Sequence, residues 1–176
     1  ITTPVGTGFR SVNVALRKTL NLNVCLRPVL SIPGAGGRYQ DVDLVIVREN
    51  SEDLYAGIEF EEGSKEATEL IEFCKEHNAG VIRSDSGISI KPISVTASQN
   101  IVRYAFDYAV KHGRKKVTAA HKANIMKHSD GLFLRTAREV AADYEGSVDF
   151  NDNIIDAFCM NLVMDPSQFD VIVFPN

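Results

Sequence analysis

Short aliphatic runs alternate with amphipathic stretches along most of the chain. Runs of Val, Ile and Leu are typical of strands that are buried on both faces, whereas apolar residues three or four positions apart are typical of helices. On this basis, strands are predicted at residues 24–27, 43–47, 115–120, 148–150 and 169–174. Helices are predicted at residues 11–21, 96–112, 130–144 and 154–163. This alternation indicates an α/β fold whose sheet is at least partly parallel.

Residues 53–94 interrupt the alternation. The pattern here predicts an edge strand at residues 55–60, an amphipathic helix at residues 64–77 and short strands at residues 81–83 and 87–91. The segment is too small to bury a strong core by itself. We therefore expect it to be stabilised by packing on something else, and a partner subunit is one candidate.

The composition argues against several classes of protein. Of the 176 residues, 44% are hydrophobic and 24% are charged, which is typical of a soluble globular chain. The net charge of -4 argues against a general nucleic-acid binder, which is usually basic. No apolar run approaches the length of a membrane-spanning helix. Any site for an anion must therefore be a local feature.

The three cysteines indicate a reducing compartment. Cys25, Cys74 and Cys159 are odd in number, far apart and each embedded in apolar sequence. This pattern predicts buried, reduced thiols rather than disulfides or a zinc site.

Cationic side chains gather at the ends of predicted elements in the first fifty residues. Asn13 and Arg17 lie four residues apart, so they share one face of the first helix, which Ser11 would cap. Arg27 ends one predicted strand and Arg48 follows another. If these ends converge, three guanidiniums meet one helix N-terminus, where free amides favour anions. The pattern predicts a pocket for a small polyanion, and the alternative is that solvated arginines flank a core.

Three further residues are candidates for proton transfer or metal binding. Tyr55 follows the acidic loop at residues 49–53, close to the arginines, where a phenol could exchange a proton. Lys122 follows a predicted strand, where partial desolvation would let it serve as a base or as a charge partner. Asp156 lies in an otherwise apolar helix, so its carboxylate should be paired, protonated or bound to Mg²⁺ or Mn²⁺.

Each of these three candidates also has a structural alternative. Tyr55 could be a packing residue, Lys122 a solvated loop residue, and Asp156 one half of a salt bridge. We interpret the neighbouring His121 as a hydrogen-bonded core residue, because nothing in the sequence orients it for catalysis.

Six segments, in order along the chain, resemble the isocitrate dehydrogenases of the β-decarboxylating dehydrogenase family, in particular the homodimeric bacterial type. They are TTPVG at residues 2–6, SVNVALR at 11–17, LRPV at 26–29, RENSEDLYAGIE at 48–59, HKANIMK at 121–127 and DAF at 156–158. The resemblance implies an isocitrate/isopropylmalate dehydrogenase-like fold in which the large cofactor domain is mostly missing. Residues 1–22 would form the edge of that domain, residues 23–52 and 95–176 the small α/β domain, and residues 53–94 a clasp that interlocks two subunits.

The resemblance also implies roles for individual residues. The residues similar to those that bind the carboxylates of isocitrate are Ser11, Asn13, Arg17, Arg27 and Arg48. Tyr55 would protonate the enolate after decarboxylation. From the neighbouring subunit, Lys122 would transfer the proton of the substrate hydroxyl and Asp156 would bind Mg²⁺ or Mn²⁺. Thr2 and Thr3 would meet the nicotinamide end of NAD or NADP.

The resemblance further implies a homodimer in the cytoplasm. Because the chain begins at Ile1 without a methionine and stops at a strand-like run, we expect an internal fragment. The remaining metal ligands and the loops that read the adenine end of the cofactor would then follow Asn176.

Three alternatives stay open. Homoisocitrate and 3-isopropylmalate dehydrogenases are the nearest enzymes, but Ser11 and Asn13 favour isocitrate because an isopropyl group would need apolar residues there. A regulatory subunit could keep the fold without catalysis, although the joint presence of Tyr55, Lys122 and Asp156 weighs against it. The preference for NAD or NADP is open as well.

Overall fold

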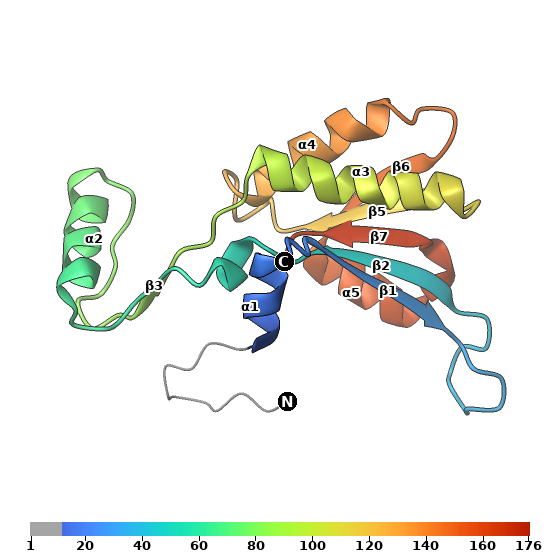
Figure 1. The fold of residues 1–176 in the computed structure, drawn as a ribbon, viewed down its shortest axis with the longest axis horizontal. Coiled ribbons are helices and arrows are strands. Elements are labelled where there is room, and N and C mark those ends of the chain that lie inside the picture. Colours follow the sequence, from blue (N-terminus) through green and yellow to red (C-terminus); the bar gives the residue numbers. More distant parts are fainter. Residues whose placement is uncertain (1–11) are drawn as a thin grey trace.

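Five strands form one mixed sheet in the computed structural model, which describes residues 12–176 (Figure 1). They are β1 (Val24–Leu30), β2 (Asp43–Glu49), β5 (Lys116–His121), β6 (Asp149–Ile154) and β7 (Val171–Phe174). Their order across the sheet is β1-β2-β7-β5-β6. β1 is antiparallel to β2, and the other neighbouring pairs are parallel. The predicted α/β fold with a partly parallel sheet is therefore confirmed.

Helices cover both faces of this sheet. α3 (Val95–Lys111) and α4 (Asp130–Ala142) pack on one face, and α5 (Ile155–Met164) packs on the other (Figure 1). The remaining helices outside residues 53–94 are α1 (Val12–Thr19) and the short 3-10 helix η2 (Pro166–Gln168). Val171 and Val173 of β7 share a core cluster with Phe106 of α3, whereas Ile172 packs with Phe158 of α5. Because neighbouring strand residues point to opposite faces, this aliphatic run is buried on both sides.

The segment between the first and second halves of the sheet projects away from it (Figure 1). It contains α2 (Lys65–Glu76) and a two-stranded ribbon of β3 (Glu59–Phe60) and β4 (Ile88–Ser89). The Ser64 hydroxyl accepts a hydrogen bond from the Ala67 amide at 3.1 Å, which caps α2 at the start of the predicted helix. Phe73 is 55% exposed and Val81 is 98% exposed. Apolar surface on this projection is therefore open to solvent in the single chain.

In this segment, one strand prediction is correct only for its last two residues, and another is wrong. Instead of an edge strand at residues 55–60, the chain forms a 3-10 helix, η1 (Asp53–Ala56), and only then the short β3. Asp53 has a left-handed φ of 65°, which breaks the extended conformation before Tyr55. Residues 81–83 form no strand, because the alternating pattern there is too short to pair without a packed face.

β6 is longer than predicted and begins one residue later, at Asp149 instead of residue 148. It continues to Ile154 because it pairs in register with the whole of β5, from Lys116 opposite Asp149 to His121 opposite Ile154. Pairing with a neighbour that is distant in sequence, rather than its own mixed composition, maintains this strand.

The cysteines are free but less buried than predicted. Cys25 and Cys74 are half-buried, and Cys159 is exposed. Cys159 belongs to α5, which packs on the sheet through Phe158 and leaves Met160 exposed. An apolar helix on an outer layer thus keeps part of its apolar surface in solvent. Within residues 12–176, no helix is both long and apolar enough to traverse a membrane.

Candidate functional site

A cavity of about 420 Å³ lies at the edge of the sheet where the parallel strands end. Arg48 reaches it from the end of β2, Lys122 from just after β5, and Asn176 from just after β7. The carboxyl ends of parallel strands are where open α/β sheets bind ligands, because the loops that leave them surround a common crevice. The register therefore brings two predicted site residues, Arg48 and Lys122, to one cavity.

Tyr55 lies between two of the predicted arginines. The guanidinium carbon of Arg17 is 5.9 Å from the centre of the Tyr55 ring, and that of Arg48 is 5.6 Å from it. Both distances allow a cation–π contact. α1 thus supplies Arg17 to the same group as the end of β2, as the sequence predicts.

Arg27 lies on β1 beside this group. Its Nε–H donates to the Cys25 sulfur at 3.3 Å, and Cys25 stands opposite Arg48 in the β1–β2 register. The pKa of Arg27 is raised, mainly by that hydrogen bond, with a smaller contribution from Tyr55. Among residues 12–176, no carboxylate forms an ion pair with any of the three guanidiniums. Their charges are therefore available to an anionic ligand.

The acidic loop after β2 is a buried and ordered support for this group. The Arg48 guanidinium donates to Asn50 Oδ1 at 3.3 Å, and the Asn50 amide donates to the Leu22 carbonyl at 3.1 Å. The Glu49 carboxylate accepts backbone N–H bonds from Ser51 and Glu52 at 2.8–2.9 Å. Glu49 is only 4% exposed and still belongs to β2, so the prediction that the strand ends before it is wrong. Backbone amides replace the water that a buried carboxylate loses.

Lys122 and Asp156 form an ion pair within the same chain. Asp156 lies in the first turn of α5, where the helix dipole favours a carboxylate, and its side chain is 69% exposed. Its position inside an apolar run suggested a buried acid, but this helix turns Asp156 towards solvent. The salt-bridge alternative therefore holds in the single chain. Metal binding at Asp156 stays a prediction, and residues 12–176 contain no group of three or more ligating side chains.

His121 is a hydrogen-bonded core residue, as interpreted from the sequence, and it also lines the smaller cavity. It is buried, its Nδ1 accepts the Ala123 amide proton at 3.1 Å, and its Nε2 lies 3.3 Å from the Asp152 carboxylate. Because Nδ1 accepts, Nε2 carries the ring hydrogen and donates to Asp152. These bonds fix the turn in which Lys122 leaves β5.

A lysine that the sequence did not single out joins the same edge of the sheet. The Lys91 ammonium lies 2.8 Å from Asp53 and 3.2 Å from Asp130, and all three side chains are largely buried. Lys91 ends a short alternating run and Asp130 opens α4, so no local motif connects them. Their meeting depends on packing between distant segments.

The remaining predicted site residues lie in or before α1. Asn13 is exposed on α1, four residues from Arg17. Ser11, Thr2 and Thr3 lie outside the described residues.

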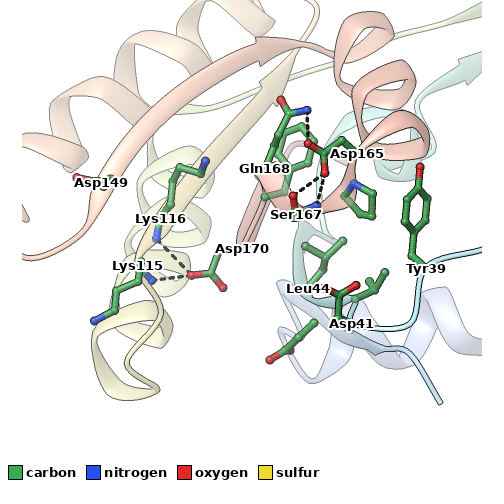
Figure 2. A pocket seen from close by; sticks show the side chains of 14 residues that line it. Tyr39, Asp41, Leu44, Lys115, Lys116, Asp149, Asp165, Ser167, Gln168 and Asp170 are labelled. Atoms are coloured by element: carbon green, nitrogen blue, oxygen red, sulfur yellow. Dashed lines mark hydrogen bonds between the residues drawn. The ribbon is translucent and has the colours of Figure 1, made fainter. Parts of the chain in front are cut away.

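A larger cavity, of about 640 Å³, opens at the opposite edge of the sheet (Figure 2). Aspartates outnumber lysines in its lining. The backbone amides of Lys115 and Lys116 donate to Asp170, and the neighbouring Arg114 pairs with Asp43 at 2.6 Å and with Asp170 at 3.1 Å. This cavity is therefore less suited to an anion than the smaller one.

The fold is that of an α/β protein, and the smaller cavity at the carboxyl edge of its sheet is lined by the predicted site residues Arg48 and Lys122. The family model for isocitrate/isopropylmalate dehydrogenase matches residues 1–176, so the chain belongs to that family.

Individual relatives agree with this assignment. The chain is 48% identical over 176 residues to a mitochondrial regulatory subunit of isocitrate dehydrogenase [NAD] of Dictyostelium discoideum, covering 100% of the chain and 44% of that protein. It is 43% identical to isocitrate dehydrogenase [NADP] of Streptococcus salivarius, covering 99% of the chain and 48% of that protein. The crystal structure of isocitrate dehydrogenase from Methylococcus capsulatus matches with a TM-score of 0.85 and 45% identity, covering 100% of the chain and 47% of that structure. The chain thus spans less than half the length of these relatives.

Proposed function

We propose that the whole protein catalyses the oxidative decarboxylation of isocitrate to 2-oxoglutarate and CO₂, with reduction of NAD or NADP. The observation that carries this proposal is the meeting of the Arg17 and Arg48 guanidiniums at the ring of Tyr55, with Arg27 on the adjacent strand β1 and no carboxylate of the described chain paired with any of the three. Isocitrate carries three carboxylates, and guanidiniums bind carboxylates through charge-assisted, often bidentate hydrogen bonds. Asn13 and Ser11 would complete the substrate site from α1.

The proposed chemistry assigns one proton transfer to each of two residues. Lys122 accepts the proton of the substrate hydroxyl as C2 is oxidised, and Tyr55 later donates a proton to C3 to give 2-oxoglutarate. A bound nicotinamide would supply the hydride acceptor for C2, and Mg²⁺ or Mn²⁺ would supply positive charge to the substrate oxygen. Asp156 would hold the metal through its exposed carboxylate, together with ligands from outside residues 12–176. Thr2 and Thr3 would contact the nicotinamide end of the cofactor.

The proposal extends to domains and subunits. Residues 1–22 would belong to the edge of the cofactor domain, residues 23–52 and 95–176 to the small domain, and residues 53–94 to a clasp. The exposed apolar residues of the projecting segment support the clasp, because a second copy of the chain would bury them. In such a homodimer, Lys122 and Asp156 would close the partner's site. Location in the cytoplasm remains a prediction.

Turnover by the full-length protein tests the proposed function. Purified protein is assayed with Mg²⁺ or Mn²⁺ and with NAD and NADP in turn, and the reduced nicotinamide and 2-oxoglutarate are quantified. We expect equal amounts of both products from isocitrate. Turnover of 3-isopropylmalate or homoisocitrate, but not of isocitrate, would overturn the choice of substrate.

A regulatory subunit is the second candidate function, because one relative at 48% identity is named as a regulatory subunit. Such a protein would use the same arginines to bind a polyanionic effector. Binding of isocitrate to the purified homo-oligomer, without turnover in the presence of metal and either nicotinamide cofactor, would favour it. Turnover by the homo-oligomer alone would exclude it.

A further inference from the structure

Lys91 is the shared counter-ion of two buried carboxylates. Its Nζ lies 2.8 Å from Asp53 Oδ2 and 3.2 Å from Asp130 Oδ2, and each aspartate side chain is only 3% exposed. Two like charges this deeply buried require a cation between them. Burial alone would lower the pKa of Lys91, but hydrogen bonding and charge from Asp53 and Asp130 raise it overall. The lysine therefore stays protonated at neutral pH and the bridge persists.

The Asp53 side of the bridge supports the 3-10 helix that carries Tyr55. Asp53 has a φ of 65°, which is unfavourable for a residue with a side chain and persists only when surrounding contacts impose it. Two hydrogen bonds do so: Asp53 Oδ1 accepts the Leu54 amide at 2.6 Å, and the Asp53 amide donates to the Pro92 carbonyl at 3.1 Å. Lys91 supplies the ionic contact beside that backbone bond. The conformation that presents Tyr55 thus depends on residues 91–92.

The Asp130 side of the bridge supports the turn that carries Lys122. The other carboxylate oxygen of Asp130, Oδ1, accepts the backbone amide of Lys122 at 2.8 Å. Asp130 thereby connects the Lys91 ammonium to the chain that leaves β5. Lys91 thus contacts Asp53 and Asp130, the two aspartates next to the backbone that carries Tyr55 and Lys122. These two residues are 67 positions apart in the sequence.

The charges around Lys91 indicate that it supports neighbouring residues and does not bind the substrate. Lys91 lines the same cavity as Arg48 and Lys122, so it could be taken for another ligand of the anion. However, its single positive charge is shared by two carboxylates, and the group of three side chains carries a net negative charge. Lys91 therefore adds no attraction for an anionic substrate, unlike Arg48.

We propose that Lys91 is a positioning residue, which through Asp53 and Asp130 holds Tyr55 and Lys122 in the geometry required for proton transfer. The inference rests on the proposed function for the roles of Tyr55 and Lys122. Loss of the bridge changes kcat, because a displacement of about 1 Å of a catalytic group lowers the rate by about 10²-fold. The KM for isocitrate stays the same, because the arginine group is retained.

The test compares Lys91→Met and Lys91→Arg with wild type in the full-length protein. Arg103→Met is the matched control, because Arg103 forms an exposed ion pair with Asp143 outside residues 53–94. We expect Lys91→Met to lower kcat by about 10²-fold with an unchanged KM, Lys91→Arg to recover most of that loss, and Arg103→Met to behave as wild type. An increase in KM at unchanged kcat would show that Lys91 binds substrate and would overturn the proposal, as would wild-type kinetics.

A second variant and a second measurement keep the inference testable if Lys91→Met does not fold or if the protein does not turn over isocitrate. Asp130→Asn keeps an oxygen that can accept the Lys122 amide but removes the negative charge that pairs with Lys91. This variant should also lower kcat without raising KM. Amide hydrogen exchange of peptides covering residues 52–57 and 121–130 needs no catalysis. We expect faster exchange in both peptides for Asp130→Asn and for folded Lys91→Met, but not for Arg103→Met. Unchanged exchange in either peptide would refute the bridge, whereas altered exchange without turnover by wild type would refute only the proposed function.

Discussion

The two edges of the parallel sheet use similar charged residues in different ways. At the edge where the parallel strands begin, the amino edge, Arg114 is paired with Asp43 and Asp170, two of the aspartates that line the cavity of about 640 Å³. At the carboxyl edge, Arg17 and Arg48 face the ring of Tyr55, and within residues 12–176 neither has a carboxylate partner. Aspartates thus predominate around the larger cavity, whereas Arg48, which lines the smaller cavity, has no carboxylate partner among the described residues.

The two cavities therefore differ in the charge of their linings, and their volumes do not reflect that difference. The acidic residues that line the amino-edge cavity are Asp41, Asp43, Asp149, Asp165 and Asp170, and its lysines are Lys115 and Lys116. An anion entering there would meet a net negative lining. At the carboxyl edge, it would replace water around guanidiniums that already lie close together, so most of the ordering is complete before binding.

The largest expected effect is a difference in kcat between variants of two lysines, one at each edge of the sheet. Lys122→Met in the full-length protein should lower kcat for isocitrate by about 10²–10⁴-fold, because it removes a group proposed to transfer a proton. Lys116→Met, at the start of β5, should leave kcat within about twofold of wild type, because it removes no group proposed to act in catalysis. Steady-state kinetics of both variants measure this contrast. Equal losses in the two variants would remove the distinction between the edges.

An intermediate effect is expected for an arginine at each edge. Arg48→Gln should raise the KM for isocitrate by about 10–100-fold, because it removes a charge-assisted contact with a carboxylate. Arg114→Gln should leave KM unchanged and lower the free energy of unfolding by about 1 kcal/mol, because it breaks pairs that hold the amino edge together. Substrate titration and urea denaturation report the two quantities. A higher KM in Arg114→Gln would show that the amino edge takes part in binding.

The smallest effect concerns Asp165, which lines the amino-edge cavity (Figure 2). Hydrogen bonding, mainly from the Ser167 hydroxyl and also from Gln168, lowers the pKa of Asp165. A carboxylate with a lowered pKa adds stability above its ordinary pKa, and this stability is lost as the pH falls through the lowered value. Asp165→Asn should therefore be slightly less stable than wild type at pH 7, and the difference should shrink below about pH 4. A difference that does not depend on pH in denaturation experiments would contradict this assignment.

Much of the fold and part of the candidate site could be predicted from the sequence. The strands of the sheet and the helices α2 to α5 are close to their predicted positions, because hydrophobic periodicity reflects which face of an element is buried. Arg17, Arg48 and Tyr55 do come together as predicted. Asp156 was placed correctly in a helix but expected to be buried, because composition does not indicate which side of an outer helix meets the sheet.

By itself, the sequence determined the α/β alternation, the family and the identity of the candidate residues, since these depend on local periodicity and on short motifs. Only the tertiary structure decided which charges are paired. Lys91 meets Asp53 and Asp130, and Lys122 meets Asp156, whereas Arg17 and Arg48 are left to face Tyr55. The physical reason is that an ion pair requires contact within a few ångströms, and sheet register and helix packing set such distances between residues that are far apart along the chain.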